Sequence, residues 1–204
     1  MEKEQKYANF EMTIKHLALL ILGIIFLEMI QQLFSLNSEP SLKLVSAFEN
    51  RRFEMILEVI LFAPIIEEVI FRLPLRKTKL YLVSIFFSLV LLINLNSYTG
   101  FIICLSVCLF NSIIFTYQVI IERDLFITYL AFISVIVFTI THINNYSEAE
   151  LNSKSIIELI TLLLPQLLLG LFCTIVRLKS NIWYSILLHS LYNGTMITFA
   201  IIQT

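Results

Sequence analysis

The chain has 204 residues, of which 58% are hydrophobic and 14% charged, and its mean hydropathy is +0.88. A soluble domain has roughly 45–50% apolar residues, so this composition excludes a soluble globular protein and indicates an integral membrane protein. A net charge of −1 without a concentrated basic run excludes a nucleic-acid-binding surface.

The apolar runs have the length of membrane-spanning helices. A helix that rises 1.5 Å per residue needs about 20 residues to cross the hydrocarbon core, and the alternation typical of barrel strands is absent. The sequence therefore predicts an all-α, polytopic transmembrane helical bundle, in a single domain over residues 1–204. We expect about seven spans, near residues 17–35, 53–73, 80–95, 100–121, 125–143, 156–176 and 181–202.

The polar segment 1–16 leads directly into the first apolar run, and no small-residue cleavage site follows. This pattern favours a retained first span over a cleaved signal peptide. With Arg72 set aside, nine basic residues lie in the N-terminal segment and the connections on its side, against four on the other side. The positive-inside rule then predicts a cytoplasmic N-terminus, and seven spans would put the C-terminus outside.

Two other features are expected to be structural. The short span 80–95 could form a partly re-entrant hairpin with the span that follows it. The three cysteines, Cys104, Cys108 and Cys173, lie in apolar segments, where a thiol behaves as a small hydrophobe. An odd number in such surroundings fits neither a disulfide framework nor a zinc knuckle, so we expect packing.

The stretch APIIEEVIFR, residues 63–72, places three charged side chains in an apolar span. A charge near the bilayer centre costs about 2.5–3.5 kcal/mol on insertion scales, so such residues indicate a functional site. Glu68 and Arg72 are four apart and can form an ion pair, whereas Glu67 is turned about 100° away and stays free. Pro64 removes a backbone donor and invites a kink. The alternative is a purely structural Glu–Arg clamp.

Two of the three histidines also lie in apolar spans. Phe138 precedes His142 by one helical turn, and His189 and Asn193 are four apart on one helix face. Taken singly, His142 could be an interfacial side chain or a hydrogen-bonded core histidine. His189 with Asn193 could be an interhelical hydrogen-bond pair.

Together, an unpaired carboxylate, two histidines and an amide on three spans favour hydrolysis. A buried carboxylate beside a histidine can take a proton from water, and a second histidine and an amide can donate to an oxyanion. Two alternatives stay open. Without catalysis, the cluster could bind a peptide or lipid, or simply lock the bundle; alternatively, Glu67, His142 and His189 could hold zinc. A transporter is disfavoured, because inverted repeats and paired broken helices are absent.

These residues form three motifs, EEVIFR (67–72), FTITH (138–142) and HSLYN (189–193), on separate spans. The chain thereby resembles the CPBP family of intramembrane peptidases, which comprises CAAX proteases and bacteriocin-processing enzymes and is also called the Abi family. The resemblance covers about residues 53–202.

The resemblance implies that Glu67 and His142 activate a water, while His189 and Asn193 stabilise the oxyanion. Glu68, Arg72 and Phe138 would be supporting motif residues. No cofactor is required, although zinc is an option. The expected partners are the bilayer, in a bacterial cell membrane, and a peptide or protein substrate. That substrate would be a CAAX-type tail, a bacteriocin leader or a signal-peptide precursor, and a role in bacteriocin immunity is the non-catalytic alternative.

Two features depart from this expectation. The interval between Glu67 and His142, 74 residues, is longer than is usual in the family, as though the hairpin 80–121 were inserted. Counted at 1.5 Å per residue from the cytoplasmic breaks, Glu67 and His189 lie roughly 14–18 Å deep, but His142 lies nearer 27 Å. The span of His142 is therefore expected to tilt, start later or dip.

Overall fold

The computed structural model describes residues 2–33, 51–76, 81–93, 105, 107–113 and 124–203. Over these residues every regular element is helical, which confirms the predicted all-α class. In chain order the elements are α1 (Glu2–Leu33), α3 (Arg52–Leu57), the π-helical turn η1 (Glu58–Phe62), α4 (Ala63–Phe71), the 3₁₀ turn η2 (Leu73–Leu75), α5 (Tyr81–Ile93), α7 (Asp124–Thr141), the 3₁₀ turn η3 (His142–Asn145), α8 (Glu148–Asn152), α9 (Ile156–Lys179) and α10 (Ile182–Gln203).

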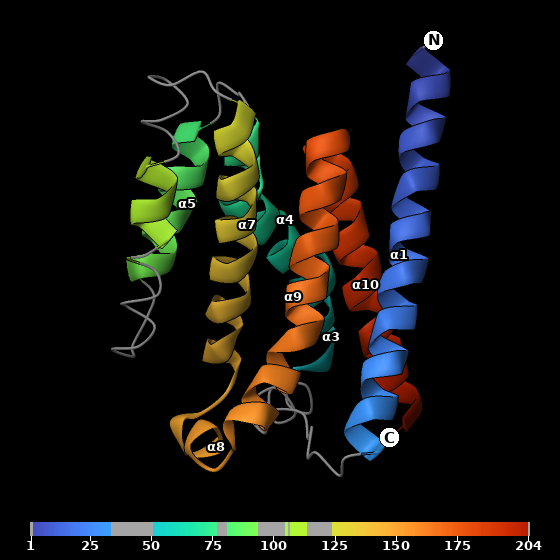
Figure 1. Ribbon diagram of the computed structural model, residues 1–204, viewed down its shortest axis with the longest axis vertical. Coiled ribbons are helices and arrows are strands. Elements are labelled where there is room, and N and C mark those ends of the chain that lie inside the picture. The colour runs from blue at the N-terminus through green and yellow to red at the C-terminus, as the bar shows by residue number, and fades with distance from the viewer. Residues whose placement is uncertain are drawn as a thin grey trace.

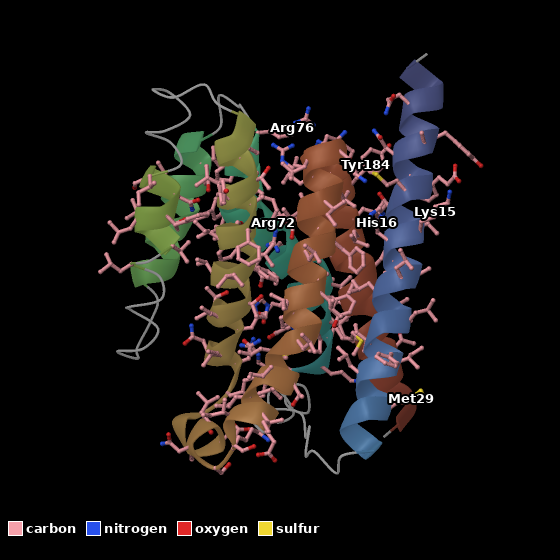
Figure 2. The ribbon with its side chains drawn as sticks, viewed as in Figure 1. Lys15, His16, Met29, Arg72, Arg76 and Tyr184 are labelled. Carbon is pink, nitrogen blue, oxygen red and sulfur yellow. The ribbon has the colours of Figure 1, made fainter. Side chains whose placement is uncertain are left out.

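The long helices α1, α7, α9 and α10 stand side by side along the long axis of the molecule (Figure 1). The shorter α4 packs against α10, α5 and α7, so it lies inside the bundle. The N-terminus and the C-terminus lie at opposite ends (Figure 1). Arg76 lies at the same end as the N-terminus, whereas Arg72 lies among the helices (Figure 2).

Local sequence signals set the starts of the last helices. Ser155 and Glu158 form a capping box at the start of α9, with Ser155 Oγ accepting from the Glu158 N–H at 3.3 Å. Such a box satisfies backbone donors that a helix start leaves unpaired. Asn181 does the same for α10, because its Oδ1 accepts from the N–H groups of Trp183 and Tyr184. Only Ser180 and Asn181 separate α9 from α10, so the two helices form an antiparallel hairpin.

The predicted single span 53–73 is broken into α3, η1 and α4. The break directly precedes Pro64, as expected from its missing N–H. In a π-helical turn each carbonyl accepts from the residue five further on, and for Val59 that residue is Pro64. The Val59 carbonyl instead accepts a hydrogen bond from Asn193 Nδ2 at 2.8 Å. The last helix therefore completes the backbone bonding that Pro64 interrupts.

Among the described residues, three helical segments are long and apolar enough to cross a membrane: Tyr7–Leu27, Ile127–Asn145 and Ile156–Lys179. The predicted count of seven spans is therefore not confirmed, although an integral membrane protein is supported. Most of the expected span 100–121 lies outside the described residues. The first candidate span, Tyr7–Leu27, begins ten residues before the predicted start at residue 17, and the helix that carries it begins at Glu2.

Candidate active site

Glu68 and Arg72 form the predicted ion pair at the end of α4, and both side chains are fully buried. Arg72 Nη1 lies 3.4 Å from Glu68 Oε1, which is ion-pair distance, but the geometry is not that of a hydrogen bond. The Arg72 guanidinium also lies 3.8 Å above the ring centroid of Phe138. A cation over an aromatic face is stabilised by the ring quadrupole, more strongly when desolvated. Phe138 thus supports the pair, in keeping with its place in the motif.

Glu67 points away from this pair, toward two histidines from different helices. Its Oε2 lies 3.8 Å from His142 Nε2 and 3.6 Å from His189 Nε2. The same oxygen is buried and has no hydrogen-bond partner among the described residues, while the side chain as a whole is 26% exposed. Glu67 is therefore the carboxylate left free by the ion pair, as the helical spacing predicts.

The remaining nitrogen of each histidine fixes its tautomer. His142 Nδ1 lies 2.9 Å from the Phe138 carbonyl, which can only accept, so Nδ1 carries the hydrogen. His189 Nδ1 lies 3.0 Å from Glu68 Oε1, again an acceptor when ionised. In the neutral rings both Nε2 atoms then present lone pairs toward Glu67. Three acceptor atoms that converge in this way can be bridged by a donor such as water, or by a cation.

The contact between Glu67 and His142 removes the depth conflict expected from the sequence. The expectation counted every residue between the connection at 76–79 and Glu67 as helical. In the structure α4 ends at Phe71, and the chain continues through the 3₁₀ turn η2 to Arg76, whose backbone is extended. These segments rise by more than 1.5 Å per residue, which makes Glu67 about 3 Å deeper. The candidate span that carries His142 begins at Ile127, so a helical count places His142 about 22 Å deep, close to Glu67.

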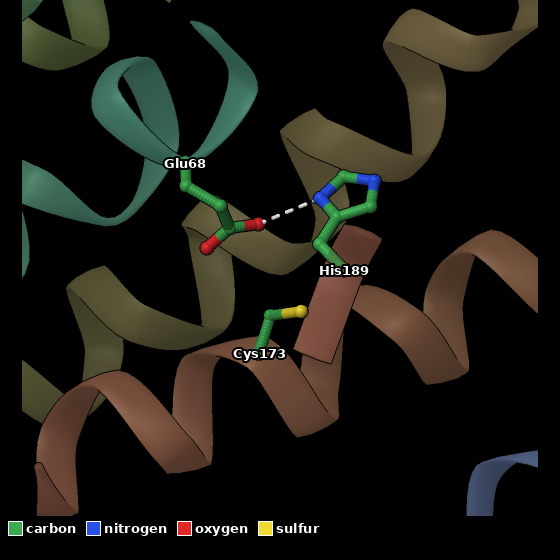
Figure 3. A group of neighbouring side chains, drawn as sticks. All are labelled: Glu68, Cys173 and His189. Carbon is green, nitrogen blue, oxygen red and sulfur yellow. Dashed lines mark hydrogen bonds and ion pairs between the residues drawn. The ribbon is translucent and has the colours of Figure 1, made fainter. Parts of the chain in front are cut away.

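Glu68, Cys173 and His189 come from α4, α9 and α10 and form a second cluster, with ligand atoms all within 4.8 Å of one another (Figure 3). The donor set suits zinc in kind. However, Glu68 already accepts from Ser185 Oγ at 2.5 Å and pairs with Arg72 and His189. A cation here would compete with the buried Arg72 guanidinium, so this cluster does not fit a metal site.

Two residues that the sequence reasoning missed complete the surroundings of the ion pair. Ser185 donates to Glu68, and it precedes His189 by four residues; the stripe Ser185, His189, Asn193 was therefore a readable signal. Gly170 faces the cation–π stack, since an added Cβ would lie 2.9 Å from Phe138 Cδ1 and 3.2 Å from Arg72 Nη2. Its role had no signal beyond a glycine in an apolar helix.

Asn193 lies one turn beyond His189 on α10 but reaches a different part of the site. Its Nδ2 donates to the Val59 carbonyl at 2.8 Å, in the π turn that precedes Glu67. One of its two amide hydrogens is therefore engaged in this structure, and the other is available to a ligand. The predicted site residues thus lie either on the segment 59–72 or beside it, with Glu67, His142 and His189 in direct proximity.

Comparison with known protein families identifies a family that this chain matches. The model of the family described as "Type II CAAX prenyl endopeptidase Rce1-like" matches residues 50–195, well over half of the chain. No curated protein and no solved structure matches the chain.

Proposed function

The chain belongs to the Rce1-like family of type II CAAX prenyl endopeptidases, and from that premise we propose that it is an intramembrane endopeptidase in which Glu67 activates the attacking water. The observation that carries the proposal is the position of Glu67 Oε2, 3.6 and 3.8 Å from two imidazole nitrogens and without a hydrogen-bond donor of its own among the described residues. This is the arrangement that general-base hydrolysis needs.

In the proposed reaction, Glu67 accepts a proton from a water that His142 Nε2 helps to orient. The hydroxide oxygen bonds to the peptide carbonyl carbon, and the carbonyl oxygen becomes an oxyanion. The C–N bond then breaks, and the proton held by Glu67 passes to the leaving amine. Each step uses groups within reach of Glu67.

His189 stabilises the oxyanion in this proposal. Its Nε2 donates only when both ring nitrogens carry hydrogens, so His189 must be protonated at that stage. The Glu68 carboxylate, 3.0 Å from Nδ1, stabilises this imidazolium, and Arg72 in turn holds Glu68. The contribution of Glu68, Arg72 and Phe138 to the reaction is therefore indirect. They hold His189 in its position and stabilise its charge.

A second candidate mechanism uses the same atoms. Glu67 Oε2, His142 Nε2 and His189 Nε2 are the donor types of a zinc site, and each histidine has the outer hydrogen bond that orients metal-binding imidazoles. Zinc would supply a bound water of lowered pKa there. We favour the metal-free reading, because Glu67 and His142 can act on water without it.

The test is cleavage of a defined probe by the purified protein. An internally quenched peptide that ends in a farnesylated Cys-aliphatic-aliphatic-X sequence should lose its last three residues, as detected by mass spectrometry. Strong chelators should leave the rate unchanged, and the protein should contain no stoichiometric zinc. One tightly bound zinc, lost together with activity, would establish the metal mechanism. Absence of cleavage of this probe and of bacterial leader peptides would favour a catalytically silent peptide-binding protein instead.

We further propose that the N-terminus faces the cytoplasm of a bacterial cell. Basic residues predominate in the N-terminal segment and the connections on its side, and Arg76 lies at the N-terminal end of the bundle (Figure 2). The substrate would then enter from the cytoplasmic leaflet.

Asn193 offers a way to separate catalysis from packing. If its second amide hydrogen serves the oxyanion, Asn193→Ala should reduce kcat by about 10²–10³-fold, as loss of such donors does, in protein that remains folded. Asn193→Asp should be tolerated only with its carboxyl protonated, because an ionised carboxylate can donate neither to an oxyanion nor to the Val59 carbonyl. The measurement is turnover and melting temperature in detergent on one sample. Parallel loss of both would mean that Asn193 acts only through the Val59 carbonyl.

A further inference from the structure

The end of α4 is held by side chains from three other helices. A helix leaves its last carbonyls without intrahelical partners, and here that end is buried inside the bundle. Four successive carbonyls, of residues 70 to 73, each accept from a side chain. Ser84 Oγ donates to Ile70 at 3.0 Å, Ser134 Oγ to Phe71 at 2.6 Å, and Arg177 to Arg72 and Leu73 at 3.0 and 3.2 Å.

We call Ser84, Ser134 and Arg177 the carbonyl cap. They come from α5, α7 and α9, and all three are buried. In an apolar bundle interior, unpaired backbone carbonyls are strongly disfavoured, so these donors define where α4 can end. The Arg177 guanidinium also places positive charge at the negative end of the helix dipole.

The carbonyl cap acts on a helix whose sides are also held by its neighbours. α4 packs against α5, α7 and α10, and its Glu68 is bonded to Ser185 and His189. Upstream, α3 and the π turn η1 run into α4 without a break, whereas downstream the α-helix stops and the chain continues in the 3₁₀ turn η2. The ends of α4 are thus set by contacts from its neighbours, with Asn193 upstream and the carbonyl cap downstream.

We propose that Ser84, Ser134 and Arg177 are positioning residues for Glu67. The first capped carbonyl, of Ile70, lies less than one helical turn after Glu67. Sliding or rotating α4 would therefore move Glu67 relative to His142 and His189, which come from other helices at 3.8 and 3.6 Å. The catalytic consequence rests on the proposed function, whereas the placement of Glu67 by the carbonyl cap does not.

The test compares Ser84→Ala and Ser134→Ala with Thr139→Val. Thr139 is a matched control, because its buried hydroxyl is also on α7 but donates to Val135 of its own helix at 2.8 Å. Arg177→Lys keeps the charge but replaces the planar fork that reaches two carbonyls. Two properties are measured on folded protein: turnover of the farnesylated peptide, and the rate at which dicyclohexylcarbodiimide modifies Glu67, read by peptide mass spectrometry.

We expect Ser84→Ala and Ser134→Ala to lower kcat by about 10-fold, and by up to the ~10²-fold that a 1 Å displacement costs, with KM unchanged. The rate of Glu67 modification should change at least about 3-fold, by the same reasoning about its displacement. Thr139→Val should match wild type in both, and Arg177→Lys should fall with the serine variants. If Arg177→Lys does not fold, the serine variants decide the question.

Glu67 modification at the wild-type rate in both serine variants would overturn the proposal, even if their melting temperatures and turnover fell together. If the wild type fails to cleave any probe while the serine variants still alter Glu67 modification, the positioning role stands and the proposed protease function fails. If the wild type cleaves and both measurements match the Thr139→Val control, the protease function stands and the positioning role fails.

Discussion

Arg72→Met is expected to destabilise the folded protein by about 3–5 kcal/mol, because it leaves the carboxylate of Glu68 buried without its cation. The cation–π contact with Phe138, at 3.8 Å, is lost in the same change. The resulting protein should melt at a markedly lower temperature in detergent, or fail to accumulate in the membrane. Thermal unfolding of variant and wild type in the same detergent measures this effect.

Two further variants show whether burial is the cause. Arg72→Lys keeps the charge but loses the planar face over Phe138, so its stability should lie between that of wild type and Arg72→Met. Arg51→Met removes ion pairs with Glu54 and Glu58 that are exposed, and exposed pairs contribute about 0–1 kcal/mol. If Arg72→Met were no less stable than Arg51→Met, the ion pair would not hold the site together.

The part of the site that follows from helical periodicity was predictable from the sequence. Residues four apart share a helix face, so the pairing of Glu68 with Arg72 and the freedom of Glu67 could be read from one segment. The approach of His142 and His189 to Glu67 could be expected only because few other polar side chains lie in apolar spans. The composition of the cluster was therefore predictable, but the distances within it were not.

Contacts between helices could not be predicted from the sequence. Ser84 and Ser134 look like any small polar residue in an apolar helix, and only the packing brings them to the end of α4. The partner of Asn193 depends on a carbonyl freed by Pro64, through a π turn that periodicity does not reveal. The depth expected for Glu67 was too small for a local reason, because residues 73–76 do not have the α-helical rise that the count assumed.

The central claim is that Glu67 is the general base, and the most direct measurement is turnover and melting temperature of Glu67→Gln on one sample. Glutamine has nearly the same shape, so the site should remain assembled, but its amide cannot take the proton from water. The account predicts a fall in kcat of at least about 10²–10⁴-fold at an unchanged melting temperature. The matched control, Glu58→Gln, changes an exposed carboxylate in the π turn η1, which precedes α4. This variant should keep wild-type turnover. Near-normal cleavage by folded Glu67→Gln would contradict the account.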